Sequence, residues 1–121
     1  MRGASRAAFA DARDRLTGVV ADTGVAATVG DELFAVVRLL DREPGLRRAL
    51  ADYTRPREAR AGLARDLLGD RVSAATLEVV SGLASARWSV PRDLADAAEE
   101  LAVLATEIGR ASCRERVCLA V

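Results

Sequence analysis

The sequence contains neither histidine nor lysine, and all eighteen of its basic residues are arginine. Without these two side chains the protein cannot form a histidine-dependent catalytic triad, a Schiff-base lysine or the lysine-containing loop that binds nucleotide phosphates. A zinc site with histidine ligands is excluded for the same reason. Most common enzyme classes are therefore ruled out, and we expect no catalytic residues, no cofactor and no metal site.

Cysteine is also scarce, and both cysteines, Cys113 and Cys118, fall near the end of the chain. Two thiols without histidine cannot complete a four-ligand zinc site. Residues 107–117, EIGRASCRERV, break the leucine pattern that precedes them and match one reading frame of a common sequencing-library adapter. We therefore predict that residues 107–121 are a non-native tail that packs poorly or merely prolongs the preceding helix. A structural helix end and a reactive cysteine pair are the alternatives.

Net charge and long apolar runs are lacking as well. Acidic and basic residues balance at a formal charge of zero, which disfavours the neutralisation of many phosphates. Acids interleave with the arginines of residues 38–71, a pattern more typical of a solvated face with ion pairs than of a nucleic-acid surface. No uncharged run approaches the roughly eighteen residues that a membrane-spanning helix needs. We expect neither nucleic-acid binding nor direct membrane insertion.

What the sequence does contain is apolar residues, 50% of the total, at the three- and four-residue spacing of amphipathic helices. Prolines mark first helical turns, hydroxyl side chains mark N-caps, and Gly69 suits a left-handed helix stop. The first helix is expected over residues 4–20, and the others open near Thr23, Pro44, Pro56, Ser73 and Pro91.

Six such helices, joined by short turns, predict an all-α fold, a compact bundle of about six helices in one domain over residues 1–106. Each helix should turn one apolar stripe toward the core. The expected core residues include Phe9, Ala12, Leu16, Val19 and Val20; Val25, Val29, Leu33, Val36, Val37 and Leu40; Leu46, Ala49, Leu50 and Tyr53; Leu63, Ala64, Leu67 and Leu68; and Leu94, Ala97, Leu101 and Leu104.

The fifth helix differs from the others because it carries two apolar stripes. One stripe is Leu77, Val80 and Ala84, and the other is Ala75, Val79, Leu83 and Ala86. Either this helix is central and buried all round, or one stripe lines a shallow groove with the small-residue face of the first helix, where a partner helix could dock. The candidate partner-binding residues are Ala4, Ala7, Ala8, Leu77, Val80 and Ala84.

Residues 6–9, a basic-Ala-Ala-Phe run, resemble the first helix of the amino-terminal domain of the ATP synthase delta subunit, a family that includes the mitochondrial oligomycin-sensitivity-conferring protein. Residues that fall where the family keeps similar ones are Pro44, Leu46, Leu50, Pro56, Leu67, Leu68, Arg87 and Leu101. The resemblance covers nearly all of the chain up to Leu104. It departs at Ala4, where the family often has an aromatic residue, and at residues 85–87, where Ser-Ala-Arg replaces Asn-Gly-Arg.

The resemblance implies a non-catalytic stator component of a proton-translocating ATP synthase, which links the catalytic head to the peripheral stalk. In this family the first and fifth helices bind the amino-terminal helix of an alpha subunit, and a carboxy-terminal domain, missing here, contacts the b subunits of the stalk. A peripheral position on the cytoplasmic face of the bacterial plasma membrane is then expected. A small helical DNA-binding or regulatory protein is the alternative.

Overall fold

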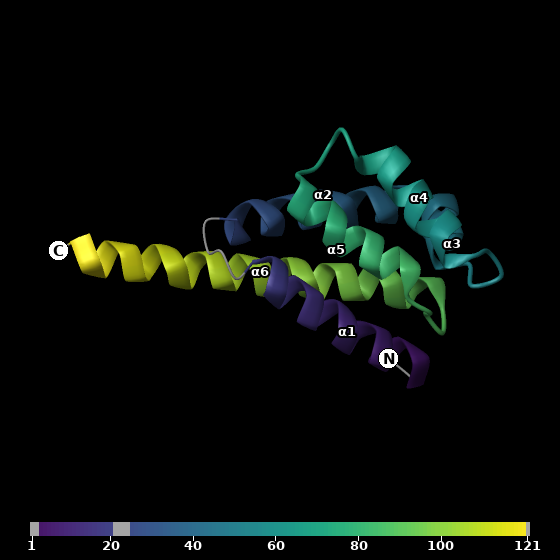
Figure 1. The fold of residues 1–121 in the computed structure, drawn as a ribbon, viewed down its shortest axis with the longest axis horizontal. Coiled ribbons are helices and arrows are strands. Elements are labelled where there is room, and N and C mark those ends of the chain that lie inside the picture. Colours follow the sequence, from purple (N-terminus) through teal and green to yellow (C-terminus); the bar gives the residue numbers. More distant parts are fainter. Residues whose placement is uncertain (1–2, 21–24, 121) are drawn as a thin grey trace.

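The computed structural model describes residues 3–20 and 25–120, with side chains described as far as residue 110. The described residues form helices without any strand, which confirms the all-α prediction (Figure 1). The helices are α1 (Gly3–Val19), α2 (Ala26–Arg42), α3 (Pro44–Ala51), α4 (Arg57–Leu68), α5 (Ala74–Ser85) and α6 (Pro91–Ala120). Within this described part, no helix is both long and apolar enough to cross a membrane.

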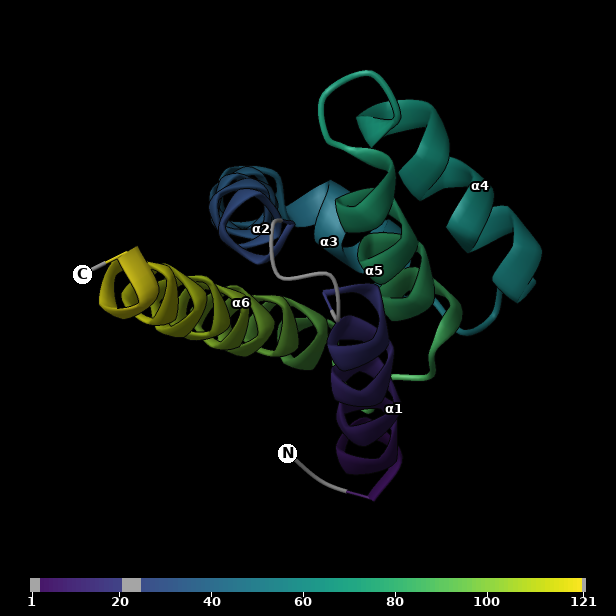
Figure 2. The ribbon, with the colours of Figure 1, turned by 60° about the vertical axis from the view of Figure 1, so that its left-hand side comes forward.

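Helices α2 and α6 run side by side and form the long axis of the bundle (Figures 1 and 2). Their close approach depends on glycine. A Cβ atom at Gly30 would lie 2.6 Å from Thr106 Oγ1 and 3.0 Å from the Thr106 backbone nitrogen, and one at Gly109 would lie 3.0 Å from Ala27 Cα. Because these positions carry no side chain, the two helices pack with their backbones nearly in contact.

Helix α5 lies in the middle of the bundle, where it contacts α1, α2, α4 and α6 (Figure 2). A cap of two side chains closes its amino terminus. Ser73 accepts a hydrogen bond from the backbone N–H of Thr76, as expected for an N-cap residue. Glu32, on α2, accepts hydrogen bonds from the Ser73 backbone N–H, the Ser73 hydroxyl and the Thr76 hydroxyl at 2.7, 2.7 and 3.0 Å.

The core is aliphatic, with a single tryptophan at one end. Trp88 is 1% exposed, and its indole N–H donates to the backbone oxygen of Leu83 at 2.7 Å. Next to it, the backbone N–H of Ser89 donates to Ser5 Oγ on α1 at 2.6 Å, and Ser5 is fully buried. The first hydrogen bond ties the turn between α5 and α6 to the end of α5, and the second joins α1 to this turn.

Most residues expected in the core are buried there, with some differences. On α1 the buried line is Ser5, Ala8, Ala12 and Leu16, whereas Phe9 and Val19 are only partly buried. Tyr53 is 58% exposed because α3 ends at Ala51, so its helical spacing no longer applies. Leu67 is 44% exposed because the buried stripe of the outer helix α4 is narrow. Both expectations were wrong.

Three predicted starting points of helices, Pro44, Ser73 and Pro91, are confirmed. Gly69 is not the predicted left-handed stop, since its φ is −55°. A Cβ atom there would lie 2.6 Å from the Arg65 carbonyl oxygen, so tight packing rather than handedness favours glycine. The predicted cap Thr23 lies outside the described residues, and α2 begins at Ala26 with no side-chain cap on the preceding Val25.

Residues 107–120 continue α6 without a break, which is one of the two forms predicted for the tail. The start of this segment is nevertheless packed. Ile108 is partly buried against the core, and Gly109 is buried against α2. The expectation of poor packing therefore fails for these two residues, and the non-native origin of residues 107–121 stays a prediction.

Candidate functional site

The structure separates the six candidate partner-binding residues into two groups. Ala4 and Ala7 are exposed on α1, with Ala8 beside them at 6% exposure, and Leu77 is half-buried. Val80 and Ala84 are 3% and 1% exposed and belong to the core. These two residues do not line an open groove, because α5 is covered by helices on several sides. The alternative of a central, largely buried helix holds at these positions.

A hollow of about 580 Å³ does open between α1 and the carboxy-terminal end of α5, with the start of α4 along one side. Its lining residues are Ala4, Ala7, Ala8, Asp11, Ala12, Arg15, Tyr53, Arg57, Arg60, Gly82, Ser85, Ala86 and Arg87. Three of its α1 residues, Ala4, Ala7 and Ala8, are those that the sequence predicted, whereas Asp11, Ala12 and Arg15 were not predicted there. On the α5 side, the lining residues lie about one helical turn closer to Arg87 than the predicted residues do. We call this site the α1–α5 hollow.

Arg60 is the most unusual residue of the α1–α5 hollow. It is only 6% exposed, and its Nη1 donates to the backbone oxygen of Ala86 at 2.7 Å. Its Nε has no hydrogen-bond partner among the described residues. Burial, followed by repulsion from Arg57, lowers the pKa of Arg60 from its ordinary value, whereas Asp52 and Glu58 oppose that shift.

The sequence interpretation placed Arg60 on a solvated face, which was wrong. Its burial had a visible signal, because Arg60, Ala64 and Leu68 follow each other at four-residue spacing on the buried stripe of α4. A long arginine stem can lie along an apolar stripe in this way while its guanidinium group reaches the edge. Sequence alone could not show that this edge borders a hollow.

Tyr53 and Arg87 form the outer rim of the α1–α5 hollow. The Arg87 guanidinium carbon lies 5.0 Å from the centroid of the Tyr53 ring, within the range of a cation–π contact. Tyr53 nevertheless stays 58% exposed. Tyrosine and arginine are both enriched among the hot-spot residues that contribute most of the binding energy at protein interfaces.

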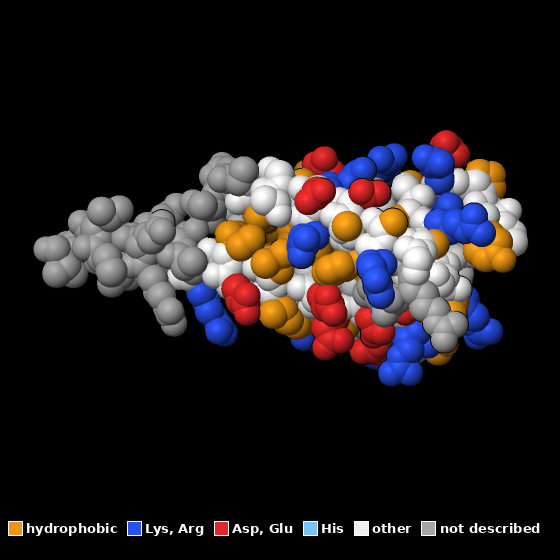
Figure 3. Space-filling model, turned by 90° about the horizontal axis from the view of Figure 1, so that it is seen from below, with side chains coloured by type: hydrophobic (Ala, Val, Ile, Leu, Met, Phe, Trp, Pro, Cys, Tyr) orange, Lys and Arg blue, Asp and Glu red, His pale blue; other side chains and the backbone are white. Residues whose placement is uncertain are grey.

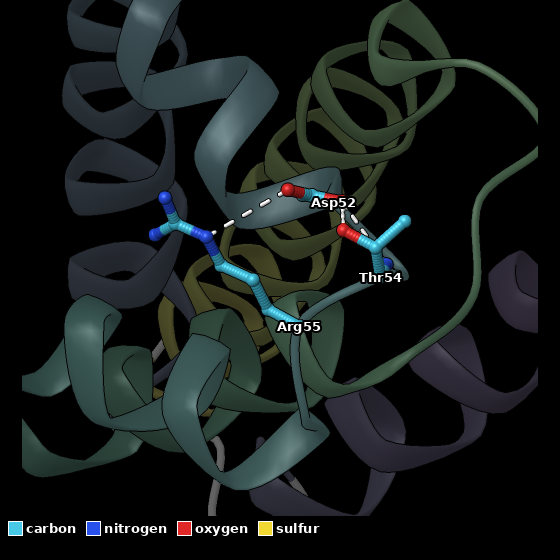
Figure 4. Close-up of polar contacts among 3 residues, drawn as sticks. All are labelled: Asp52, Thr54 and Arg55. Atoms are coloured by element: carbon cyan, nitrogen blue, oxygen red, sulfur yellow. Dashed lines mark hydrogen bonds and ion pairs between the residues drawn. The ribbon is translucent and has the colours of Figure 1, made fainter.

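The loop that carries Tyr53 is stiffened by a local turn (Figure 4). Asp52 Oδ1 accepts hydrogen bonds from both the hydroxyl and the backbone N–H of Thr54, and Asp52 Oδ2 lies 3.7 Å from Arg55 Nε. The hydroxyl bond, then the backbone bond, lowers the pKa of Asp52. The ionised Asp52 therefore stabilises the turn fully at a pH above the ordinary carboxyl pKa. This stabilisation is lost as the pH falls through the lowered pKa of Asp52.

Arg15 crosses from α1 toward α5 over a glycine. A Cβ atom at Gly82 would lie 2.8 Å from both Cδ and Nε of Arg15, so the missing side chain leaves room for the arginine. Together with Arg57, Arg60 and Arg87, Arg15 gives the α1–α5 hollow four arginines against one acid, Asp11. The lining of the hollow is thus basic, whereas the face of the molecule drawn in Figure 3 mixes acidic, basic and apolar side chains.

The described residues contain no group of three or more His, Cys, Asp or Glu side chains placed to hold a metal ion. The α1–α5 hollow instead combines small apolar side chains from α1 with an aromatic rim and fixed guanidinium groups. Such a surface is suited to a protein segment with an apolar face and at least one acidic side chain.

Comparison with known proteins identifies several similar chains, although no family model matches. The chain is 50% identical over 103 residues to ATP synthase subunit delta of Streptomyces griseus, which covers 84% of this chain and 38% of that protein. It is 47% identical over 115 residues to ATP synthase subunit delta of Thermobifida fusca, covering 95% of this chain and 42% of that protein. The corresponding subunit of Streptomyces coelicolor is 49% identical over 106 residues, 87% of this chain and 39% of that protein.

The chain thus spans about two fifths of the length of the curated relatives that it matches. Identity at this level over most of a chain reflects common descent. The resemblance to the amino-terminal domain of the delta subunit is therefore confirmed, and over the matched residues the chain is a homologue of ATP synthase delta subunits.

Proposed function

We propose that the chain acts as part of a non-catalytic stator subunit of a proton-translocating ATP synthase. In this role it links the catalytic head to the peripheral stalk by binding the amino-terminal helix of an alpha subunit in the α1–α5 hollow. The b subunits of the stalk are contacted through a carboxy-terminal domain beyond this chain. The protein is peripheral on the cytoplasmic face of the bacterial plasma membrane, held there by its partners.

The observation that carries the proposal is the α1–α5 hollow itself. It lies between the two helices to which the family resemblance assigns the binding of the alpha subunit, and three of its α1 residues, Ala4, Ala7 and Ala8, are those predicted. Small side chains let another helix approach closely, as in other helix-in-groove complexes. The similarity to delta subunits supports the same role.

The energetics are compatible with such docking. Each apolar anchor that a docked helix buries contributes roughly 1.5 to 3 kcal/mol. Association entropy and side-chain ordering remove much of the sum from three or four anchors, so we expect a dissociation constant of about 1 μM or below for an isolated peptide.

Binding is tested by calorimetry with a synthetic peptide of the amino-terminal segment of the alpha subunit from Streptomyces griseus. Ala7→Asp places a charge on the apolar side of the hollow and is expected to weaken binding by about a hundredfold. Ala10→Asp is the matched control, because Ala10 is exposed on α1 but does not line the hollow. If both variants bind like the wild type, or if the wild type does not bind, the proposal is wrong.

A further inference from the structure

We propose that the arginines of the α1–α5 hollow, centred on Arg60 and Arg57, receive a carboxylate from the docked helix and so fix its register. The inference rests on the proposed function and extends it. It states which chemistry the partner segment must carry: an acidic side chain on or beside its apolar face.

The lining of the α1–α5 hollow carries an excess of basic charge. Although the whole sequence is neutral, four arginines and only one acid line this site. Asp52, in the loop that carries Tyr53, is hydrogen-bonded to Thr54 and lies 3.7 Å from Arg55, so it and Glu58 act on Arg60 only through their charge. No ion pair between Arg60 and an acid occurs within the described part of the chain. The basic charge of the hollow is therefore left for a partner to balance.

Arg60 has one donor without a hydrogen-bond partner among the described residues. Its Nε is buried without a hydrogen-bond partner, and a buried donor left unpaired is unfavourable. The bond from Nη1 to the Ala86 oxygen holds one end of the guanidinium group in place beside the α1–α5 hollow, which Arg60 lines. A carboxylate is the side chain whose two oxygens best match such a fixed, planar donor.

The apolar part of the lining indicates which kind of anion fits the hollow. One side of the hollow is formed by Ala4, Ala7 and Ala8, and Tyr53 stands at the rim. A free inorganic anion would leave these apolar groups unused, whereas a helix with an apolar face covers them and brings its carboxylate to the arginines. Burial, and then repulsion from Arg57, lowers the pKa of Arg60, and a carboxylate from the docked helix would favour its charged form.

The experiment is a double-mutant cycle with the Streptomyces griseus alpha-subunit peptide. Each Glu and Asp of the peptide is replaced in turn by Gln or Asn, and each peptide is titrated into the wild type, Arg57→Gln and Arg60→Gln. Arg65→Gln is the matched control, because Arg65 is exposed on the same helix but does not line the hollow. Arg57 is exposed, so its variant remains informative even if Arg60→Gln fails to fold.

We expect one neutralised peptide position to lose about tenfold in affinity for the wild type, as Arg57→Gln does for the unmodified peptide. The neutralised peptide should bind Arg57→Gln only slightly more weakly than the unmodified peptide does, because the two changes remove the same contact. Arg65→Gln should bind each peptide with the affinity of the wild type. If every neutralised peptide binds as well as the original while Ala7→Asp still weakens binding about a hundredfold, the carboxylate inference is wrong and the proposed function stands. If the peptide does not bind at all, both are wrong.

Discussion

Glu32 is the residue whose role in stability is clearest. It reaches from α2 to the start of α5 and accepts three hydrogen bonds there, from Ser73 and Thr76. Glu32→Ala should destabilise the protein by about 1 to 3 kcal/mol, because buried donors lose an acceptor and the helix loses a negative charge at its amino terminus. Urea unfolding measures the loss. Asp31→Ala, at an exposed neighbour, should change stability by only a few tenths of a kcal/mol, and equal effects of the two would refute the capping role.

Single residues also show where sequence reasoning stops. Ser73 was predicted as a cap because capping is local, whereas Glu32 lies 41 residues away and no local pattern links the two. Val80 was predicted to line the groove, because helical spacing gives stripes but not the neighbours that cover them. Arg60 was missed because a charged residue on a buried stripe is rare.

Substituting alanine for glycine should have opposite effects at Gly30, where two helices pack closely, and at Gly62, where there is open space. Gly30→Ala should destabilise the bundle by about 1 to 2 kcal/mol, since the new Cβ would meet the Thr106 backbone and α2 and α6 would have to separate. Gly62→Ala is the matched control on α4, where a Cβ would meet nothing within 4 Å. It should stabilise by about 0.5 to 1 kcal/mol through helix propensity. Thermal unfolding followed by circular dichroism measures both, and effects of the same sign would contradict this account.

At the scale of helices the sequence was most informative, because periodicity and caps are properties of contiguous residues. The positions where three helices begin, Pro44, Ser73 and Pro91, were predicted from the preferences of proline for the first turn and of serine for the N-cap. The position of the hollow did not follow in the same way. It depends on where α5 ends, at Ser85, and on how α4 places Arg60 at the edge of the hollow.

The whole molecule is joined at the point where α1, α5 and α6 meet around Trp88. Ser5 and Ser89, 84 residues apart, are hydrogen-bonded there, and α1 packs against both α5 and α6. The α1–α5 hollow can bind a partner only while α1 stays in place. Docking of α1 therefore links the stability of the bundle to its proposed function.

This linkage predicts that α1 unfolds together with the rest of the protein. Leu16 is fully buried, so Leu16→Ala should destabilise the whole bundle by about 2 to 5 kcal/mol. Trp88 is the single tryptophan, and its fluorescence reports the junction while circular dichroism reports all helices. The two urea transitions should coincide in the wild type and shift together in Leu16→Ala. Thr17→Ala, at the exposed neighbouring position, should leave them almost unchanged. A fluorescence transition that precedes the loss of helix would show instead that α1 detaches on its own, and the hollow would then be open only part of the time.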